Sequence, residues 1–336
     1  MKIEARVMFF DGRMDYLPAY KLFCLDMEPN EKLVSFCHRI KELDESFDFE
    51  GEYPLMRING WVVHSARTIQ DVVEVCGSEW RVEPVSKYRC INDLIIDESD
   101  FWKAFERIEP YASMEDRFFF ASLKDIHYAS ATFEFDKEYI GDAVLITAHR
   151  MIKRGNPNKE AILKAISENV SGLWSCEFEV GVLGGRDYSG AIEELRSWTE
   201  PPKPSLIHKI CSAFGKRRET PQVQTLQEVP LALYRPTPKM VTELKERGAI
   251  IIDFSKKNRK AGQTLLAYNP DLAYKKGAAV LLDAMDSGAE LLVCSSKEDA
   301  EYFRSNFGNF ERASGREIYI EIIAFEELQT IKEEVQ

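Results

Sequence analysis

The seven cysteines of this 336-residue chain offer the widest choice of chemistry. A thiolate can bind a metal ion, hold an iron–sulfur cluster or act as a nucleophile. Metal and cluster sites normally contain two cysteines separated by two residues, whereas the nearest pair here, Cys24 and Cys37, is 13 positions apart. We therefore expect most of these thiols to be small buried residues of a reduced protein.

Cys294 is the best local candidate for a reactive residue. It ends a predicted strand and precedes a predicted helix that begins with Ser295, Ser296 and Lys297. Ligands of α/β proteins bind at the carboxyl ends of parallel strands, and a helix N-terminus lowers the pKa of a thiol. Cys294, Ser295 and Ser296 are therefore a candidate reactive or ligand site, and the alternative is a buried or helix-capping position.

Other residue types give weaker indications. His64, His127 and His149 are far apart in the sequence and lack the H-E-x-x-H spacing of a zinc site, so we predict no metal ion and no cofactor. The glycine-rich stretch Gly181–Asp187 lacks the G-K-[ST] ending of a phosphate-binding loop, and we expect it to pack as a structural loop. The basic run Phe254–Gln263 could meet an anion or simply be solvated.

Composition and charge exclude some classes of partner. The first residues, MKIEARVMFF, lack the apolar core of a signal peptide, and no run of about 18 apolar residues indicates a membrane span. We therefore predict a cytoplasmic protein without a transmembrane segment. The net charge of −12 argues against a nucleic-acid partner, because phosphates require a basic surface.

The elements that would position these residues fall into several segments. In residues 1–111, strand patterns surround an amphipathic helix over residues 30–44, which predicts a small β-grasp-like domain. Residues 112–200 are mostly helical, with one long helix ending at Gly155. Residues 230–336 alternate between helix and strand, which predicts an α/β layer domain with a mostly parallel sheet.

A proline-rich stretch, EPPKPS at Glu200–Ser205, marks the clearest break and opens a linker over residues 201–229. Within it, Leu206, Ile210 and Phe214 are four apart, on one face of a predicted helix that also carries basic residues. The helix Leu206–Phe214 could dock peripherally on a partner or a membrane surface. The alternative is a connector helix that packs on its own protein.

Residues 1–200 resemble the iron–sulfur subunit of succinate dehydrogenase and fumarate reductase. Four stretches carry the resemblance, in family order and at family spacing: MRINGWVVHSART (Met56–Thr68), VEPVSKYRCINDLIIDESDFW (Val82–Trp102), EYIGDAVLITAHRMI (Glu138–Ile152) and GLWSCEFEV (Gly172–Val180). The resemblance implies a β-grasp domain of the 2Fe-2S ferredoxin type followed by an α-helical ferredoxin-like domain.

The cluster ligands that the resemblance implies are missing. Ala66 occupies the position of the last cysteine around the first cluster, and Cys176 is the single cysteine left of the third group. The stretches where the other groups should lie, 46–55 and 122–138, contain no cysteine. Because a cluster needs about four thiolates, Ala66 and Cys176 are vestigial positions. We expect bulky residues to fill the former cluster sites: Tyr53, Leu55, Tyr128, Phe133, Phe135 and Phe178.

The C-terminal segment is more weakly similar to the cysteine-rich CCG domain of heterodisulfide reductase. Leu281–Phe303 carries this similarity and brings Cys294 near that family's C-P-x-C position. The paired cysteines that define the family are absent, and KAGQTLLAYNP stands in their place. Such domains accompany succinate and fumarate reductase subunits in some bacteria.

These observations lead to one main hypothesis and two alternatives. We expect a non-redox relative of a respiratory subunit that binds protein partners as a scaffold, adaptor or regulator, without an assigned enzymatic activity. The first alternative is a small-molecule-binding protein or enzyme that uses a pocket beside Cys294. The second is a redox role through an intermolecular disulfide, which requires an exposed thiol of low pKa.

Overall fold

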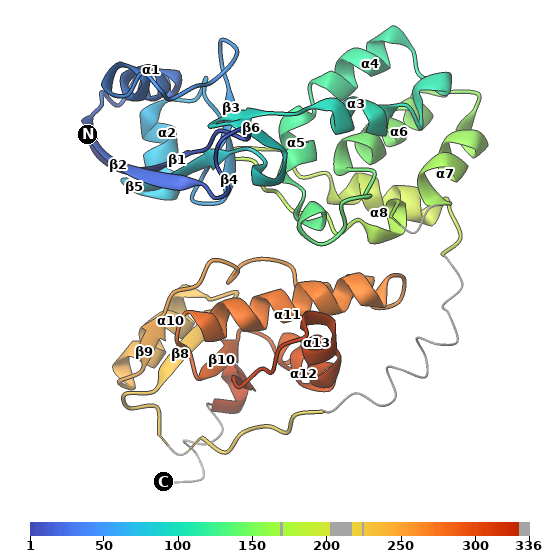
Figure 1. Ribbon diagram of the computed structural model, residues 1–336. Helices are drawn as coiled ribbons and strands as arrows, with labels where there is room; N and C mark the ends of the chain where they lie inside the picture. Colours follow the sequence, from blue (N-terminus) through green and yellow to red (C-terminus); the bar gives the residue numbers. More distant parts are fainter. Residues whose placement is uncertain (169–170, 202–216, 224, 329–336) are drawn as a thin grey trace. The chain divides into compact units, whose positions relative to one another are not determined.

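The computed structural model describes residues 1–168, 171–201, 217–223 and 225–328. Its fold is mixed α/β, and the chain divides into two compact units, Met1–Glu200 and Pro201–Gln336 (Figure 1). The boundary expected near Tyr111 lies inside the first unit and stays a prediction. The helix expected over Leu206–Phe214 lies outside the described residues.

The first unit begins with a five-stranded sheet in the order β2-β1-β5-β3-β4. Its strands are β1 (Lys2–Phe9), β2 (Ala19–Asp26), β3 (Leu55–Ile58), β4 (Trp61–His64) and β5 (Glu79–Pro84). β1 pairs antiparallel with β2 and parallel with β5, and β3 pairs antiparallel with both β4 and β5.

Helices α1 (Val34–Leu43) and α2 (Ile69–Cys76) cover one face of this sheet (Figure 1). Alternate residues of β1 are buried because successive side chains of a strand point to opposite faces. Ile3 and Val7 on β1 share a core with Phe36 of α1 and Val72 of α2. The opposite face, which we call the outer face, carries the charged residues of β1 and β5.

The rest of the first unit is mostly helical. After the short strands β6 (Cys90–Asn92) and β7 (Ile95–Ile96), it contains α3 (Ser99–Phe105), α4 (Met114–Ala121), α5 (Lys124–Ala129), α6 (Asp142–Lys153), α7 (Lys159–Ser167) and α8 (Ser189–Ser197), with short 3-10 turns at 87–89, 109–111, 131–134 and 173–175. Helix α6 is the centre of this part, because α4, α5, α7 and α8 all pack against it.

The glycine-rich stretch joins the sheet to the helices. The amide of Val62 on β4 donates to the carbonyl of Gly181 over 2.9 Å, and the amide of Leu183 donates to the carbonyl of Val62 over 2.8 Å. Gly181 lies so close to α5 that an added Cβ would be 3.0 Å from the carbonyl oxygen of Ala129. A side chain at position 181 would therefore crowd α5 where the loop passes between strand and helix.

The second unit contains a four-stranded sheet in the order β11-β10-β8-β9. All three strand pairs are parallel, in agreement with the alternating sequence pattern. The strands are β8 (Pro230–Tyr234), β9 (Ile250–Ile252), β10 (Leu291–Cys294) and β11 (Glu321–Ala324); the helices are α10 (Pro238–Glu246), α11 (Pro270–Asp286), α12 (Lys297–Ser305) and α13 (Phe307–Ser314), with a 3-10 turn at Gln263–Leu265. One apolar core lies on each side of the sheet. Successive residues of β10 show this, since they belong alternately to the two clusters.

Among the described residues, no helix combines the length and the apolar character that crossing a membrane requires.

Candidate interaction surface

The Cys294 thiol, the candidate reactive residue, is enclosed in the core of the second unit. Cys294 lies at the end of β10, between Tyr234 of β8 and Ala324 of β11, and its side chain is fully buried. Burial and the nearby carboxylate of Asp299 raise its pKa well above the ordinary value. The direction is opposite to the lowering of the pKa expected from the helix N-terminus, because burial disfavours the thiolate.

The two serines that follow Cys294 have structural contacts. The amide of Ser295 donates to the carbonyl of Tyr234 over 3.1 Å. Ser296 is the N-cap of α12: its Oγ accepts from the amide of Asp299 over 3.1 Å and donates to the carboxylate of Asp299 over 2.9 Å. These contacts are the ones expected of a helix-capping position, which was the alternative to a reactive or ligand site.

Ala66 lies in a segment whose neighbours hold the sheet and helices together. The carbonyl of Ser65 accepts from the amide of Val34, and the carbonyl of Arg67 accepts from the amide of Leu33. Thr68 caps α2 through a reciprocal pair of hydrogen bonds with Asp71. The resemblance around Ala66 therefore coincides with structural contacts that need no cluster.

Cys176 is buried in a small polar network. Its Sγ lies 3.4 Å from the Oδ1 of Asp142, which also accepts from the hydroxyl of Tyr139 over 2.6 Å. Burial, followed by the charge of Asp142, raises the pKa of Cys176 well above the ordinary value. No group of three or more His, Cys, Asp and Glu residues in the described part of the chain could hold a metal ion.

The bulky residues expected in the former cluster sites differ in burial. Tyr128, Phe133 and Phe178 are buried, whereas Tyr53, Leu55 and Phe135 are only half-buried. A cavity of about 10 Å³ remains beside Phe178, which is room for about one water molecule. His127, which lies against Phe133, is fully buried.

The two edge strands of the first sheet, β4 and β2, differ in how far other segments cover them. At one edge, the segment Gly181–Leu183 pairs with Val62 and covers β4. At the other edge, the eight residues of β2 are mostly exposed on both faces. Exposed edge strands offer unpaired backbone groups to other chains, so β2 is a candidate interaction surface.

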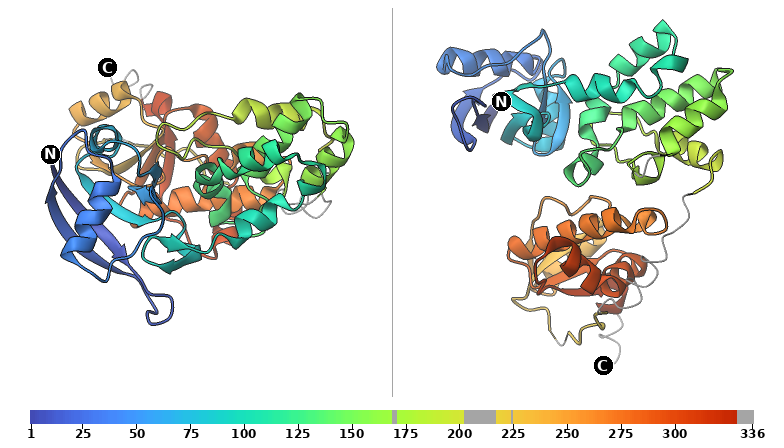
Figure 2. Two further views of the ribbon diagram at one scale, coloured as in Figure 1. Left: turned by 90° about the horizontal axis from the view of Figure 1, so that it is seen from above. Right: turned by 45° about the vertical axis from the view of Figure 1, so that its right-hand side comes forward.

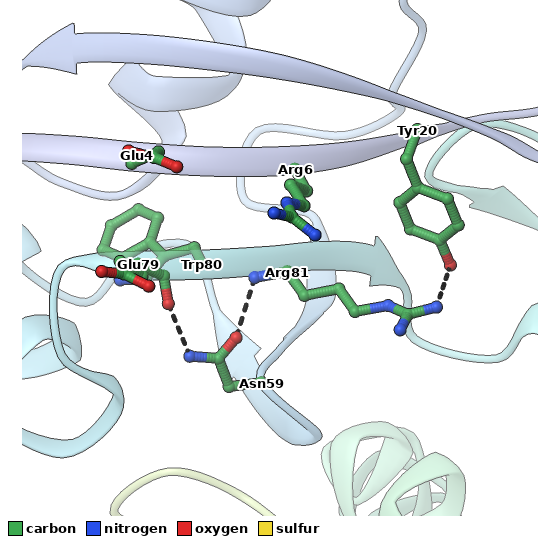
Figure 3. Close-up of a pocket in the computed structure, with 7 residues that line it drawn as sticks. All are labelled: Glu4, Arg6, Tyr20, Asn59, Glu79, Trp80 and Arg81. Carbon is green, nitrogen blue, oxygen red and sulfur yellow. Dashed lines mark hydrogen bonds between the residues drawn. The ribbon is translucent and has the colours of Figure 1, made fainter. Parts of the chain in front are cut away.

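A groove of about 430 Å³ lies on the outer face beside β2 (Figure 3). Glu4 of β1 is level with Glu79 of β5, and Arg6 is level with Arg81. The groove thus has an acidic end and a basic end. Asn59 also lines the groove, and its side chain accepts from the amide of Arg81 over 2.8 Å and donates to the carbonyl of Glu79 over 2.8 Å (Figure 3).

A polar network connects this groove to β2. The hydroxyl of Tyr20 accepts from Arg81 over 2.9 Å and donates to Glu83. Burial raises the pKa of Glu83, but the hydrogen bond from Tyr20 and the charges of Lys87 and Arg81 outweigh burial, so the pKa lies below its ordinary value. Glu83 therefore stays ionised at neutral pH and fixes the ring of Tyr20.

The turn between β1 and β2 projects from the sheet (Figure 2) and presents apolar side chains to solvent. Met14, Tyr16 and Leu17 are 85%, 95% and 72% exposed, and we call these three residues the hairpin surface. The base of the turn is fixed, because the amide of Gly12 donates to the carbonyl of Ile91 over 2.9 Å. Large apolar side chains on a fixed turn are typical of an interaction site.

Sequence reasoning missed both the hairpin surface and the groove. The run MDYLPAY contains a signal for the hairpin surface, because large apolar residues lie beside a proline between two predicted strands. The groove had no local signal. Its two walls, β1 and β5, are far apart in the sequence and become neighbours only in the folded sheet.

No protein-family model matches the chain, and no curated protein matches it. Among solved structures, the chain is similar to a hypothetical protein from Helicobacter pylori, with a TM-score of 0.50 and 19% identity over 97% of this chain and 70% of that one. This similarity is one of fold. The chain also matches a chain of the Mycobacterium smegmatis Sdh1 complex in the apo form, with a TM-score of 0.39 and 12% identity over 60% of this chain and 98% of that one.

Proposed function

We propose that this protein is a non-redox, cytoplasmic binding protein that acts as a scaffold, adaptor or regulator. In this proposal the first unit is a β-grasp, ferredoxin-like domain followed by an α-helical ferredoxin-like domain, both without clusters. The second unit is an α/β domain similar to the CCG domain of heterodisulfide reductase. The hairpin surface on the first unit contacts a protein partner.

The exposure of the hairpin surface is the observation that carries the proposal. Met14, Tyr16 and Leu17 leave most of their apolar area in water, at a cost that burial against a partner would remove. Tyrosine is also among the residues that contribute most to protein–protein affinity.

The non-redox part of the proposal is supported by the vestigial positions. Ala66 has no ligand atom, and the thiol of Cys176 is held against Asp142 in a closed network. Iron content and visible absorbance of the full chain, purified anaerobically, test this part. We expect no iron and no cluster absorbance, and stoichiometric iron would contradict it.

Partner binding is tested by capturing interacting proteins with the full chain as bait. The double variant Tyr16→Asp, Leu17→Asp places charge on the hairpin surface, so we expect it to lose a partner that the unaltered chain retains in stoichiometric amount. Val75→Asp is the matched control, because Val75 is a 52% exposed apolar residue of α2 away from the turn. Equal recovery of the partner with the double variant would contradict the proposal.

A further inference from the structure

We infer that the open edge of β2 pairs antiparallel with β2 of a second copy of this chain, so that two sheets join across a two-fold axis at Leu22. The inference does not depend on the proposed partner of the hairpin surface. It rests on the backbone of β2, on the side chains of its outer face and on the distribution of charge along it.

The pairing of β2 with β1 shows which backbone groups of β2 have no strand partner in the described part of the chain. The amide of Met27 donates to the carbonyl of Met1 over 2.8 Å, and the N-terminal amine donates back to the carbonyl of Met27. Hydrogen-bonded and non-hydrogen-bonded pairs alternate along an antiparallel ladder. With the constant register of this pair, the odd-numbered residues of β2 therefore bond to β1.

The even-numbered residues Tyr20, Leu22 and Cys24 consequently direct their amide and carbonyl groups away from β1, towards the open side. Asp26 belongs to the same set, but its carbonyl already accepts from the guanidinium of Arg39. The strand contains no proline between Ala19 and Asp26. Nothing in its sequence therefore prevents another strand from pairing with it.

The side chains of this set favour burial. Leu22 is 57% exposed, Tyr20 is 36% exposed and Cys24 is exposed. All three lie on the outer face, where Tyr20 is held by its hydrogen bonds to Arg81 and Glu83. A partner strand would extend this face and cover apolar side chains that are now in water.

Charge favours a second copy of the chain as the occupant. The protein has a net charge of −12, so two copies repel each other over most of their surfaces. Residues 19–25 contain no acidic side chain, and Lys21 is the single charged residue among them. The edge of β2 is thus a place where two acidic chains can approach without opposing like charges.

One register uses all the free groups. When Leu22 lies opposite Leu22 of the second copy, Tyr20 lies opposite Cys24 and Lys21 lies opposite Phe23. Each free even-numbered residue then forms a hydrogen-bonded pair, and no two like charges face each other. A register shifted by two residues places Tyr20 opposite Asp26, whose carbonyl is already bonded to Arg39.

The oligomeric state of the full chain in solution is the first test. We expect a dimer by sedimentation equilibrium at micromolar concentrations. Leu22→Pro removes an amide that faces away from β1, so the fold should persist while the dissociation constant rises at least ~10-fold through lost pairing. Leu22→Val keeps the amide and should remain dimeric, and circular dichroism establishes that both variants are folded.

Disulfide trapping tests the register. In the variant Leu22→Cys, Cys24→Ser, the two cysteines face each other at a Cα–Cα distance of about 5.5 Å, within the reach of a disulfide, so mild oxidation should give a covalent dimer. In the unaltered chain the two Cys24 residues are offset by roughly 13 Å along the strands and should not cross-link. The other cysteines are unchanged in both proteins.

Two results would overturn the inference. One is a monomeric unaltered chain, as expected if the strand of a different protein occupies this edge. The other is cross-linking through Cys24 that equals or exceeds cross-linking through Leu22→Cys. Loss of the hairpin partner with the dimer intact would count against the proposed function alone.

Discussion

The guanidinium of Arg57 donates to the backbone carbonyl of Tyr128 over 2.5 Å and so joins β3 to α5. The same side chain donates to the carbonyls of Val85 over 2.8 Å and Gly60 over 3.0 Å. One arginine thus connects the sheet with the helical part of the first unit. The MRING stretch therefore contributes packing contacts that connect β3 to α5.

We expect replacement of Arg57 to destabilise the first unit. Arg57→Lys cannot reproduce three contacts in different directions, because an ammonium lacks the planar fork of a guanidinium. Leaving the carbonyls of the buried residues Val85 and Tyr128 without this donor should lower the free energy of unfolding by about 2 kcal/mol, measurable by urea denaturation. Arg6→Ala, on the exposed outer face, should change it by less than about 0.5 kcal/mol. A fully stable Arg57→Lys would show that these contacts contribute little.

Local patterns in the sequence predicted the helices and strands better than they predicted which residues are buried or exposed. The helix expected to end at Gly155 is found as Asp142–Lys153, because its apolar spacing and its flanking glycines are local signals. The alternation in residues 230–336 likewise indicated the parallel sheet. Both depend only on residues close together in the chain.

The exposure of particular residues depends on strand order, which no local pattern encodes. Cys294 was correctly placed at the end of a strand, but its burial arises because β10 lies between β8 and β11. β2 contains the continuous apolar run Leu22–Leu25, yet it lies at an edge and is mostly exposed on both faces. The candidate site therefore changed from a strand end in the second unit to a sheet edge in the first.

His127 should make the protein less stable in acid. Both of its ring nitrogens are without a hydrogen-bond partner in the described part of the chain. Burial, assisted by the charge of Arg89, lowers its pKa to about 3. Because its unfolded pKa is about 6.5, the unfolded state binds the proton more tightly. Stability is therefore fully present above pH 6.5 and is lost as the pH falls towards 3.

The contribution of His127 can be isolated with variants. From pH 6.5 to pH 4.5 it should amount to about 2–3 kcal/mol. His127→Leu should remove this part of the pH dependence, measured as the difference in the free energy of unfolding at the two pH values. His38→Gln, at an exposed histidine of α1, retains His127 and should therefore keep this part of the pH dependence. If His127→Leu lost as much stability in acid as the unaltered chain, His127 would not be the source of that loss.

Gly141 should be intolerant of a side chain. Its φ is +87°, and an added Cβ would lie 2.4 Å from Nδ1 of His127. Gly155 has a similar φ of +82° but nothing within 4 Å of such an atom. We therefore expect Gly155→Ala to cost about 1 kcal/mol from the backbone alone, and Gly141→Ala to cost about 2 kcal/mol more because of the clash.

Thermal or urea unfolding of the two alanine variants measures this difference. Combining Gly141→Ala with His127→Ala removes the clashing ring, so the two changes should be less destabilising together than the sum of their separate effects. Equal destabilisation by Gly141→Ala and Gly155→Ala would mean that the His127 ring moves aside without cost.

Thiol labelling should separate the cysteines by burial. Cys24 is exposed, whereas Cys37, Cys176 and Cys294 are buried, and burial raises the pKa of each of these three thiols. The thiolate is the reactive form. In the native protein, iodoacetamide should therefore modify Cys24 faster than the buried three, which react only when the chain opens. Peptide mass spectrometry after timed labelling assigns each rate, and labelling in urea should make the rates equal. Modification of native Cys294 as fast as Cys24 would support Cys294 as a reactive residue. It would also mean that the second unit opens often enough to expose this buried thiol.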